Sequence, residues 1–435
     1  MARATAMLGD KLVKLASGAV LAILVARWLG ASDLGIYSIV MAWSAFLVPV
    51  SSFGLNNIVV RQMAKFDNQA DAITMLYSAV SMRLVLGIAS AVVALSLFYF
   101  IYPEFNSGYI NIAVFILFFC QAFIGFLLFE FYLNYLGVFR RVAYAKSVIT
   151  FLSFALKLFL LYQGVGIAAL LLMTGIEFFL VALSQWLFYR FAKVRPQVSG
   201  TNLNSSGSSI LLFKTEMAIT LLKRSSWLWF SGIVSVIYLK IDIVMIGAMA
   251  GTEQAGVYAA ASRLSELWYV FPATLAARYY PDMIAAFNAG EAQYYSRLKH
   301  YARLFFLAAL SIAVIMTLCA PWIIDLLFGQ AFANAIQVLQ IHVWAGCFIF
   351  IRYLISQHLL ITEQEPLSLM SHGIGALLNV LLNLWLIPAH GIVGAAWATL
   401  ISYAYASFFF LFCASSTRRQ LWKTLKAGVH KHSNV

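Results

Sequence analysis

Charged residues are scarce in this 435-residue chain. They make up only 10% of the sequence, whereas hydrophobic residues make up 63%. The mean hydropathy is +0.87. A soluble domain of this length needs about 25% charged residues to cover its surface. The composition therefore excludes a soluble globular protein and predicts an integral membrane protein.

The chain also lacks the patterns of an enzyme or a metalloprotein. Its four cysteines all fall in apolar stretches and have neither disulfide nor metal-site spacing: Cys120, Cys319, Cys347 and Cys413. There is no glycine-rich loop ending in Lys-Ser or Lys-Thr and no Ser/His/Asp arrangement. His342, His358 and His372 are scattered, and we assign them no site. We therefore expect no cofactor, no metal and no ATP hydrolysis.

The apolar stretches are long enough for about twelve membrane-spanning helices, each needing roughly 20 residues. The fold class that we expect is an all-α integral membrane protein. The predicted spans are 10–29, 36–58, 74–101, 110–137, 143–163, 166–189, 226–249, 255–278, 302–324, 334–361, 367–387 and 391–413.

The positions of Lys and Arg predict the orientation in the membrane. With the N-terminus in the cytoplasm, 23 of the 29 Lys and Arg residues lie either in cytoplasmic segments or at the cytoplasmic ends of the spans, as Lys14 does at the entrance of the first helix. The outward loops contain no Lys or Arg, and their charged residues are all acids, such as Asp33 and Glu253. This distribution obeys the positive-inside rule and places both termini in the cytoplasm. The net charge of +13 is then a topology signal, and nucleic-acid binding is not expected.

A Ser/Gly/Asn-rich segment near the middle divides the chain into two similar halves. The predicted organisation is a six-helix lobe over 1–195, a linker over 196–225, a second six-helix lobe over 226–414 and a basic tail over 415–435. Similar motifs follow in the same order in both halves. The first pair of motifs is Gly30-x4-Gly35-x-Tyr37, followed by Pro49, and Gly251-x4-Gly256-x-Tyr258, followed by Pro272. The second pair, near the end of each half, begins with Gly164-x-Gly166 in the first half and with Gly391-x2-Gly394 in the second. An even number of spans per half predicts parallel repeats, a transporter design with substrate bound between the halves.

Six basic side chains lie inside the predicted spans and away from their cytoplasmic ends: Arg27, Arg83, Lys157, Lys240, Arg263 and Arg352. Only four acids share these spans: Glu130, Glu177, Asp242 and Glu266. Each charge at mid-bilayer costs roughly 2.5–3.5 kcal/mol on insertion scales. Because pairing alone leaves a positive surplus, some of the cations are expected to face a hydrated cavity or an anion.

The spacing of these charges suggests partners for some of them. Arg263 and Glu266 share a helix face and can pair, and Asp242 is a candidate partner for Arg263 from the neighbouring span. Interhelical ion pairs that only fix packing explain the same residues, so both interpretations stay open. Asn379 and Asn383, one helical turn apart, are expected to form interhelical hydrogen bonds.

The remaining charges are less constrained by the sequence. Lys157 lies in the outer half of its span, where we expect it to face the cavity. Arg83 and Arg352 lie towards the cytoplasm and are able to snorkel, as Arg27 is at the outer end of its helix. Glu130 and Glu177 are either counter-ions or carriers of coupling protons.

Several motifs resemble polysaccharide-repeat flippases of the Wzx type. They are Ala26-Arg27-Trp28-Leu29-Gly30, Gly35-Ile36-Tyr37, the run from Lys240 to Gly247, the run from Ala255 to Glu266, and Pro388-x2-Gly391-Ile392-x-Gly394. Their order and spacing extend over essentially the whole chain. That family belongs to a superfamily of multidrug, oligosaccharidyl-lipid and polysaccharide exporters.

The resemblance implies two six-helix lobes around a central cavity, with Arg27, Asp242, Arg263 and Glu266 near it. The implied substrate is an undecaprenyl-pyrophosphate-linked sugar repeat, flipped to the outer leaflet of the bacterial inner membrane for O-antigen, lipopolysaccharide or other surface polysaccharide. Implied partners are this lipid, membrane lipids, a polysaccharide polymerase, a chain-length regulator, and a proton or sodium ion for coupling.

Three alternatives compete with this interpretation. A drug exporter of the same superfamily needs an acidic cavity, whereas basic residues dominate here. A lipid II flippase normally has two additional C-terminal spans. A membrane-embedded polysaccharide polymerase or ligase generally needs a large outward loop, which the predicted topology lacks.

Overall fold

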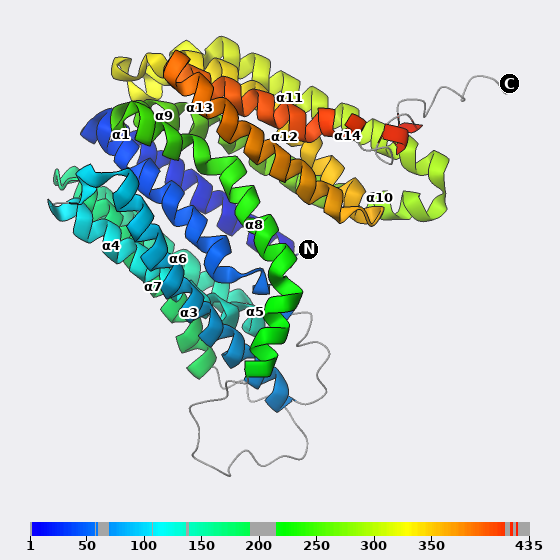
Figure 1. Ribbon diagram of the computed structural model, residues 1–435, viewed down its shortest axis with the longest axis horizontal. Coiled ribbons are helices and arrows are strands. Elements are labelled where there is room, and N and C mark those ends of the chain that lie inside the picture. Colours follow the sequence, from blue (N-terminus) through cyan, green and yellow to red (C-terminus); the bar gives the residue numbers. More distant parts are fainter. Residues whose placement is uncertain are drawn as a thin grey trace. The chain divides into compact units, whose positions relative to one another are not determined.

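The computed structural model describes residues 2–56, 58–59, 69–106, 108–135, 139–191, 215–413, 418–420 and 423–424. The chain folds into two compact units of helices (Figure 1). The first contains Met1–Leu21 and Val40–Val236, and the second contains Ala22–Ile39 and Ile237–Val435. The described residues are almost entirely helical and contain no β-strand, which confirms the all-α membrane fold.

Nine helical stretches of the described chain are long and apolar enough to cross a membrane. Two of them are double. Leu15–Ser52 contains the first two predicted spans, and Pro366–Phe409 contains the last two. A glycine breaks the helix inside each, at Gly30 (φ 90°, ψ −177°) and at Gly391 (φ 58°, ψ −139°). Counting each double stretch twice, the nine stretches correspond to eleven of the twelve predicted spans.

The remaining predicted span, 255–278, is broken and carries more charge. It consists of α9 (Thr252–Glu266), the 3-10 turn η3 (Leu267–Tyr269) and α10 (Val270–Ala289). Proline is tolerated in the first turn of a helix because the amide there needs no partner. Pro272, the third residue of α10, is therefore compatible with the start of this helix.

The first unit contains most of the helices of the N-terminal half of the chain. They are α3 (Gln69–Ile101), η1 (Pro103–Phe105), α4 (Gly108–Ala122), η2 (Phe123–Leu127), α5 (Leu128–Tyr135), α6 (Phe139–Tyr162) and α7 (Ile167–Phe191). α1 (Ala2–Ser52) and α8 (Thr215–Ala250) belong in part to each unit. α7 packs on both α4 and α6 (Figure 1). A core cluster around Leu76, Leu128 and Phe129 joins α3 to α5.

In the second unit α12 is the central helix, since it packs on α9, α10, α11 and α13. The elements are α9, η3, α10, α11 (Glu291–Phe328), η4 (Gln330–Phe332), α12 (Asn334–Ile361), α13 (Glu365–Ala404), the π-helical turn η5 (Tyr405–Phe409) and α14 (Phe410–Cys413). α11 extends over 38 residues, longer than the bilayer requires.

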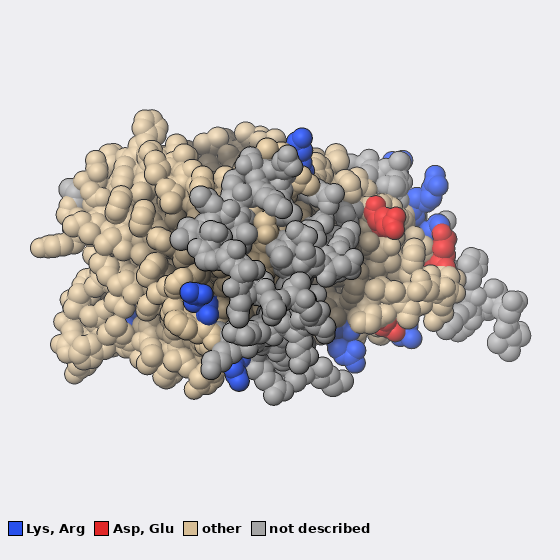
Figure 2. Space-filling model, turned by 90° about the horizontal axis from the view of Figure 1, so that it is seen from below, with Lys and Arg blue, Asp and Glu red and all other residues tan. Residues whose placement is uncertain are grey.

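Large apolar side chains are exposed on both units. Phe100 is 84% exposed in the first, and Trp322 and Trp385 are 75% and 70% exposed in the second. Figure 2 shows a face on which a few charged side chains, mostly basic, stand among extensive uncharged surface. Because soluble proteins do not expose apolar surface on this scale, these side chains are expected to contact lipid.

Candidate functional site

The two Gly-x4-Gly-x-Tyr motifs form turns with the same local backbone. We call residues 30–37 the first turn and residues 251–258 the second turn. Gly30 has φ 90° and ψ −177°, and Gly251 has φ 89° and ψ 170°. Residues with a Cβ rarely adopt this conformation, which explains why glycine opens both motifs.

The two turns contact each other reciprocally inside the second unit. A Cβ on Gly35 would lie 1.8 Å from the carbonyl oxygen of Thr252, and a Cβ on Gly256 would lie 1.8 Å from that of Ala31. The hydroxyl groups of Ser32 and Thr252 lie 2.9 Å apart. The second glycine of each motif therefore allows the backbones of the two helices to approach closely.

Two of the predicted cations lie beside this contact. The guanidinium carbon of Arg263, on α9, is 5.6 Å from the centre of the Tyr37 ring, a cation–π arrangement. Arg27 donates hydrogen bonds to the carbonyl groups of Leu326 and Leu327. Since these carbonyl groups lie in the last turn of α11, Arg27 caps that helix.

Asp242 is buried among hydrogen-bond donors from two other helices. Asn383 Nδ2, on α13, donates to Oδ1 over 2.7 Å. Tyr258 OH, on α9, and Thr399 Oγ1, on α13, donate to Oδ2 over 3.0 and 2.5 Å. Asn383 also donates to Asn379 Oδ1 over 3.0 Å. The predicted interhelical hydrogen bond of Asn383 is confirmed.

Glu266 has an ion-pair partner that helix spacing did not suggest. Lys240 Nζ, on α8, lies 2.7 Å from Glu266 Oε2. The sequence suggested Arg263 as its partner, because the two share a helix face. Lys240 reaches Glu266 across the gap between α8 and α9, which sequence spacing alone cannot reveal. All three side chains are only partly buried.

In the first unit, both acids of the predicted set have lysine partners. Buried Lys157, on α6, lies 2.6 Å from Glu177 Oε2, on α7, and Ser153 donates to the same oxygen. Glu130 accepts from Lys146, which the sequence analysis grouped with the cytoplasmic charges. The pairing of Glu177 agrees with its interpretation as a counter-ion.

Arg83 and Arg352 are the most buried of the six cations, 1% and 4% exposed. Arg83 Nη1 donates to Asn56 Oδ1 over 2.8 Å. Arg352 donates to Ser368 and to the carbonyl oxygen of Ala406, and its Nη2 lies 2.6 Å from His372 Nδ1. Among the described residues, neither guanidinium has a carboxylate partner, and neither Nε has a hydrogen-bond acceptor.

Several neutral residues of these clusters were not predicted from the sequence: Asn56, Ser153, Tyr258, Ser368 and Thr399. Only Tyr258 carried a signal, because it repeats Tyr37. Within the described part of the chain, no group of three or more His, Cys, Asp or Glu side chains is arranged to hold a metal ion.

The comparison with family models decides the family. The model described as "Polysaccharide biosynthesis protein" matches residues 7–284, more than half of the chain. The chain belongs to this family. The resemblance seen in the sequence motifs is thereby confirmed.

Individual proteins are more distant. The probable low-salt glycan biosynthesis flippase Agl15 of Haloferax volcanii is 26% identical over 188 residues, 43% of this chain and 40% of the relative. The match thus spans less than half of that relative's length.

Two solved structures share the fold over nearly the whole chain. The lipid II flippase MurJ in an inward closed conformation has a TM-score of 0.72 and 16% identity, covering 97% of this chain and 90% of its own. An inward-facing multidrug resistance MATE family transporter of the MOP superfamily has a TM-score of 0.73 and 17% identity, covering 96% of each. At these identities the likeness shows a shared fold.

Proposed function

We propose that this protein flips an undecaprenyl-pyrophosphate-linked oligosaccharide repeat from the inner to the outer leaflet of the bacterial inner membrane, for O-antigen or another surface polysaccharide. The family and the glycan flippase relative support a lipid-linked glycan as substrate. Alternating access, with the N- and C-terminal six-helix lobes moving against each other, is the proposed mechanism.

The observation that carries this proposal is the imbalance of charge in the predicted spans. Glu130, Glu177 and Glu266 are each paired with a lysine, and Asp242 accepts from neutral donors. Because the basic side chains of these spans outnumber the acidic ones, the spans carry a positive surplus.

A pyrophosphate group needs such a surplus to cross the membrane. Arginine offers two parallel hydrogen bonds to phosphate and stays charged when partly dehydrated, whereas lysine acts as a point charge. Arg263 is the best placed, because it is only partly buried and its guanidinium lies against Tyr37. Lys240, on the neighbouring helix, is also proposed to contact phosphate, although Glu266 offsets its charge. Arg83 and Arg352 are proposed to contribute mainly through their electric field, since both are buried.

The coupling ion is proposed to bind at Asp242. Its carboxylate, the amide oxygen of Asn379 and the hydroxyl oxygens of Tyr258 and Thr399 come together from three helices. Oxygen ligands of this kind suit a hard cation such as sodium. A proton on Asp242 is the alternative, and it requires one hydroxyl group to turn from donor to acceptor.

Deletion of the gene tests the proposed direction of transport. Lipid-linked single repeats should accumulate in the cytoplasmic leaflet, which an impermeant glycan-modifying reagent detects in oriented vesicles. Accumulation of single repeats in the outer leaflet would instead indicate a polymerase.

Complementation with variants tests the phosphate site. Arg263→Ala should abolish surface polysaccharide, and Arg263→Lys should retain part of it, at unchanged amounts of membrane-inserted protein. Arg297→Ala is the control, because this side chain is half exposed on α11. Full activity of Arg263→Ala would refute the phosphate role, and transport of organic cations without flipping would favour the drug-exporter alternative.

Asp242→Asn tests the coupling site, since it removes the charge and keeps the shape. We expect transport by this variant to lose its response to the driving gradient. Flipping driven in vesicles by a sodium gradient alone identifies sodium as the coupling ion, and flipping driven by a pH gradient alone identifies the proton. An undiminished response in Asp242→Asn would rule out this site.

A further inference from the structure

A pocket of about 520 Å³ lies in the second unit, and none of the six cations or four acids described above lines it. Its walls come from α11, α12, η5 and the C-terminal residues Gln420 and Thr424. The volume is within the range of ordinary ligand pockets, about 300–1,000 Å³.

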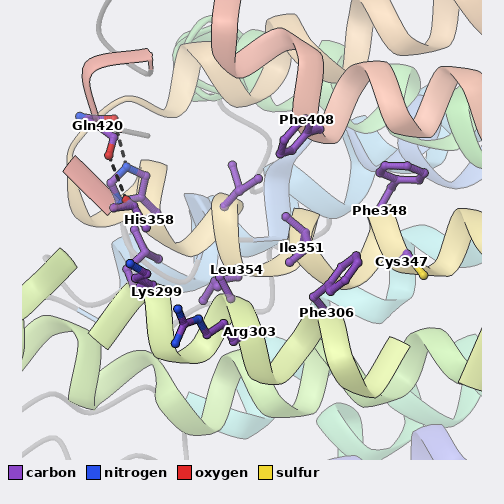
Figure 3. A pocket seen from close by; sticks show the side chains of 14 residues that line it. Lys299, Arg303, Phe306, Cys347, Phe348, Ile351, Leu354, His358, Phe408 and Gln420 are labelled. Atoms are coloured by element: carbon purple, nitrogen blue, oxygen red, sulfur yellow. Dashed lines mark hydrogen bonds between the residues drawn. The ribbon is translucent and has the colours of Figure 1, made fainter. Parts of the chain in front are cut away.

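One end of the pocket is basic. Lys299 and Arg303 are four residues apart on α11 and therefore share a helix face. Figure 3 shows them at the same end as His358 and Gln420, whereas Phe306 and Phe348 lie at the other end. None of the lining residues is Asp or Glu. Within the described chain, Arg303 has neither an ion pair nor a hydrogen bond.

The C-terminal segment completes this end. His358 Nε2 lies 3.0 Å from Gln420 Oε1, and His358 Nδ1 lies 2.7 Å from Tyr294 OH. Because an amide oxygen only accepts, Nε2 donates and Nδ1 accepts from the tyrosine. Lys423 Nζ lies 2.6 Å from Glu291, which ties the segment to α11. The wall is thus built by specific hydrogen bonds and is more than an exposed helix surface.

The rest of the pocket is apolar and about one leaflet deep. Along α12 it extends from His358 to Cys347, eleven residues, or about 17 Å at 1.5 Å per residue. This is about half of the roughly 30 Å hydrocarbon core of a bilayer. Phe306, Ile351 and Phe408 line this part.

We infer that this pocket binds an anionic phospholipid of the cytoplasmic leaflet, with its phosphate at Arg303 and Lys299 and an acyl chain along Phe306 and Phe348. Two basic groups without a lining acid match an anionic headgroup, and the depth matches one acyl chain. The inference rests on the proposed orientation, which places the start of α11 at the cytoplasm, and does not depend on the transported substrate.

The site predicts a lipid preference that can be measured on the purified full-length protein. Native mass spectrometry in detergent should show at least tenfold tighter binding of phosphatidylglycerol than of phosphatidylcholine. Arg303→Ala together with Lys299→Ala should remove this preference. Arg297→Ala, which changes a basic residue of the same helix outside the pocket, should leave it intact.

A second variant tests the apolar part without changing charge. Phe306→Ala and Phe348→Ala should weaken binding of long-chain phosphatidylglycerol more than binding of a short-chain form. Equal binding of the two headgroups, or unchanged preference in the double basic variant, would overturn the inference. Displacement of phosphatidylglycerol by equimolar undecaprenyl phosphate would also overturn it, because the pocket would then hold the substrate lipid.

Discussion

The first and second turns have the same backbone and different chemistry. Both open with a glycine near φ 90°, and both place a second glycine against the backbone of the other turn. The tyrosine that closes each motif differs in its partner. Tyr37 presents its ring to Arg263, whereas Tyr258 donates its hydroxyl to Asp242.

The glycines of the motif thus determine the shape of both turns, whereas the tyrosines differ between the turns in the charged group that they contact. The glycines serve one shared contact, so changes at equivalent glycines should have equal effects. The tyrosines act on charges of opposite sign, one on a cation through its ring and one on a carboxylate through its hydroxyl. The same substitution at the two tyrosines should therefore have unequal effects.

The largest effect is expected at the glycines of the contact. In Gly35→Ala or Gly256→Ala the new Cβ meets a carbonyl oxygen at 1.8 Å, so the helices must separate. Overpacking of this kind costs about 1–3 kcal/mol. The midpoint temperature of thermal unfolding in detergent should fall, and so should the amount of surface polysaccharide. Each loss should be similar in the two variants.

The contact also predicts non-additivity. Once one alanine has separated the turns, the second alanine meets a contact that is already loosened. The double variant should therefore lose less free energy of unfolding than the sum of the two single variants. Gly373→Ala is the control, since no atom lies within 4 Å of its new Cβ. Strict additivity would show that the two glycines do not act on one contact.

Tyr258→Phe should have the next largest effect. It removes one of the donors to the buried Asp242 carboxylate, and a hydrogen bond to a charged group contributes about 1.5–3 kcal/mol. The apparent affinity for the coupling ion should change, while protein amounts stay close to normal. Thr399→Val, which removes another donor to the same carboxylate, should act in the same direction. An unchanged ion dependence in both variants would argue against the Asp242 site.

Gly30→Ala and Gly251→Ala should lower the stability of the protein by smaller amounts, which should be equal in the two turns. No atom lies within 4 Å of either new Cβ, so only the backbone conformation is strained. A residue other than glycine in this region costs of order 1–3 kcal/mol if the turn keeps its shape, and less if it relaxes. Thermal unfolding of the purified variants measures the loss, and a marked difference between the two would show that only one turn is held rigidly.

The sequence was sufficient to predict the helices, because apolar runs and glycine breaks are local signals. Gly30 and Gly391 fell where one predicted span ends and the next begins, and the structure breaks the helix at both. Ion pairs within the charged set were less predictable. Helix spacing suggested Arg263 for Glu266 and gave no sign of Lys240, which pairs with it from another helix.

Neutral partners were the least predictable part. Thr399 lies 157 residues from Asp242, and serine or threonine occurs in every predicted span except 110–137, so nothing local distinguishes this one. A buried carboxylate implies that donors exist without saying which residues supply them. Tyr258 was the exception, because its repetition of Tyr37 drew attention to the position.

The smallest effect is expected from Tyr37→Phe, and it gives the sharpest test of the comparison. Phenylalanine keeps the ring that faces Arg263, so flipping should remain near normal, in contrast to Tyr258→Phe. Tyr37→Leu removes the ring and should weaken flipping, since a cation–π contact contributes about 0.5–2 kcal/mol. Paired measurements of the four variants Tyr37→Phe, Tyr37→Leu, Tyr258→Phe and Tyr258→Leu separate ring from hydroxyl. If Tyr37→Phe were as damaging as Tyr258→Phe, the first turn would also act through its hydroxyl, and the chemical difference between the turns would disappear.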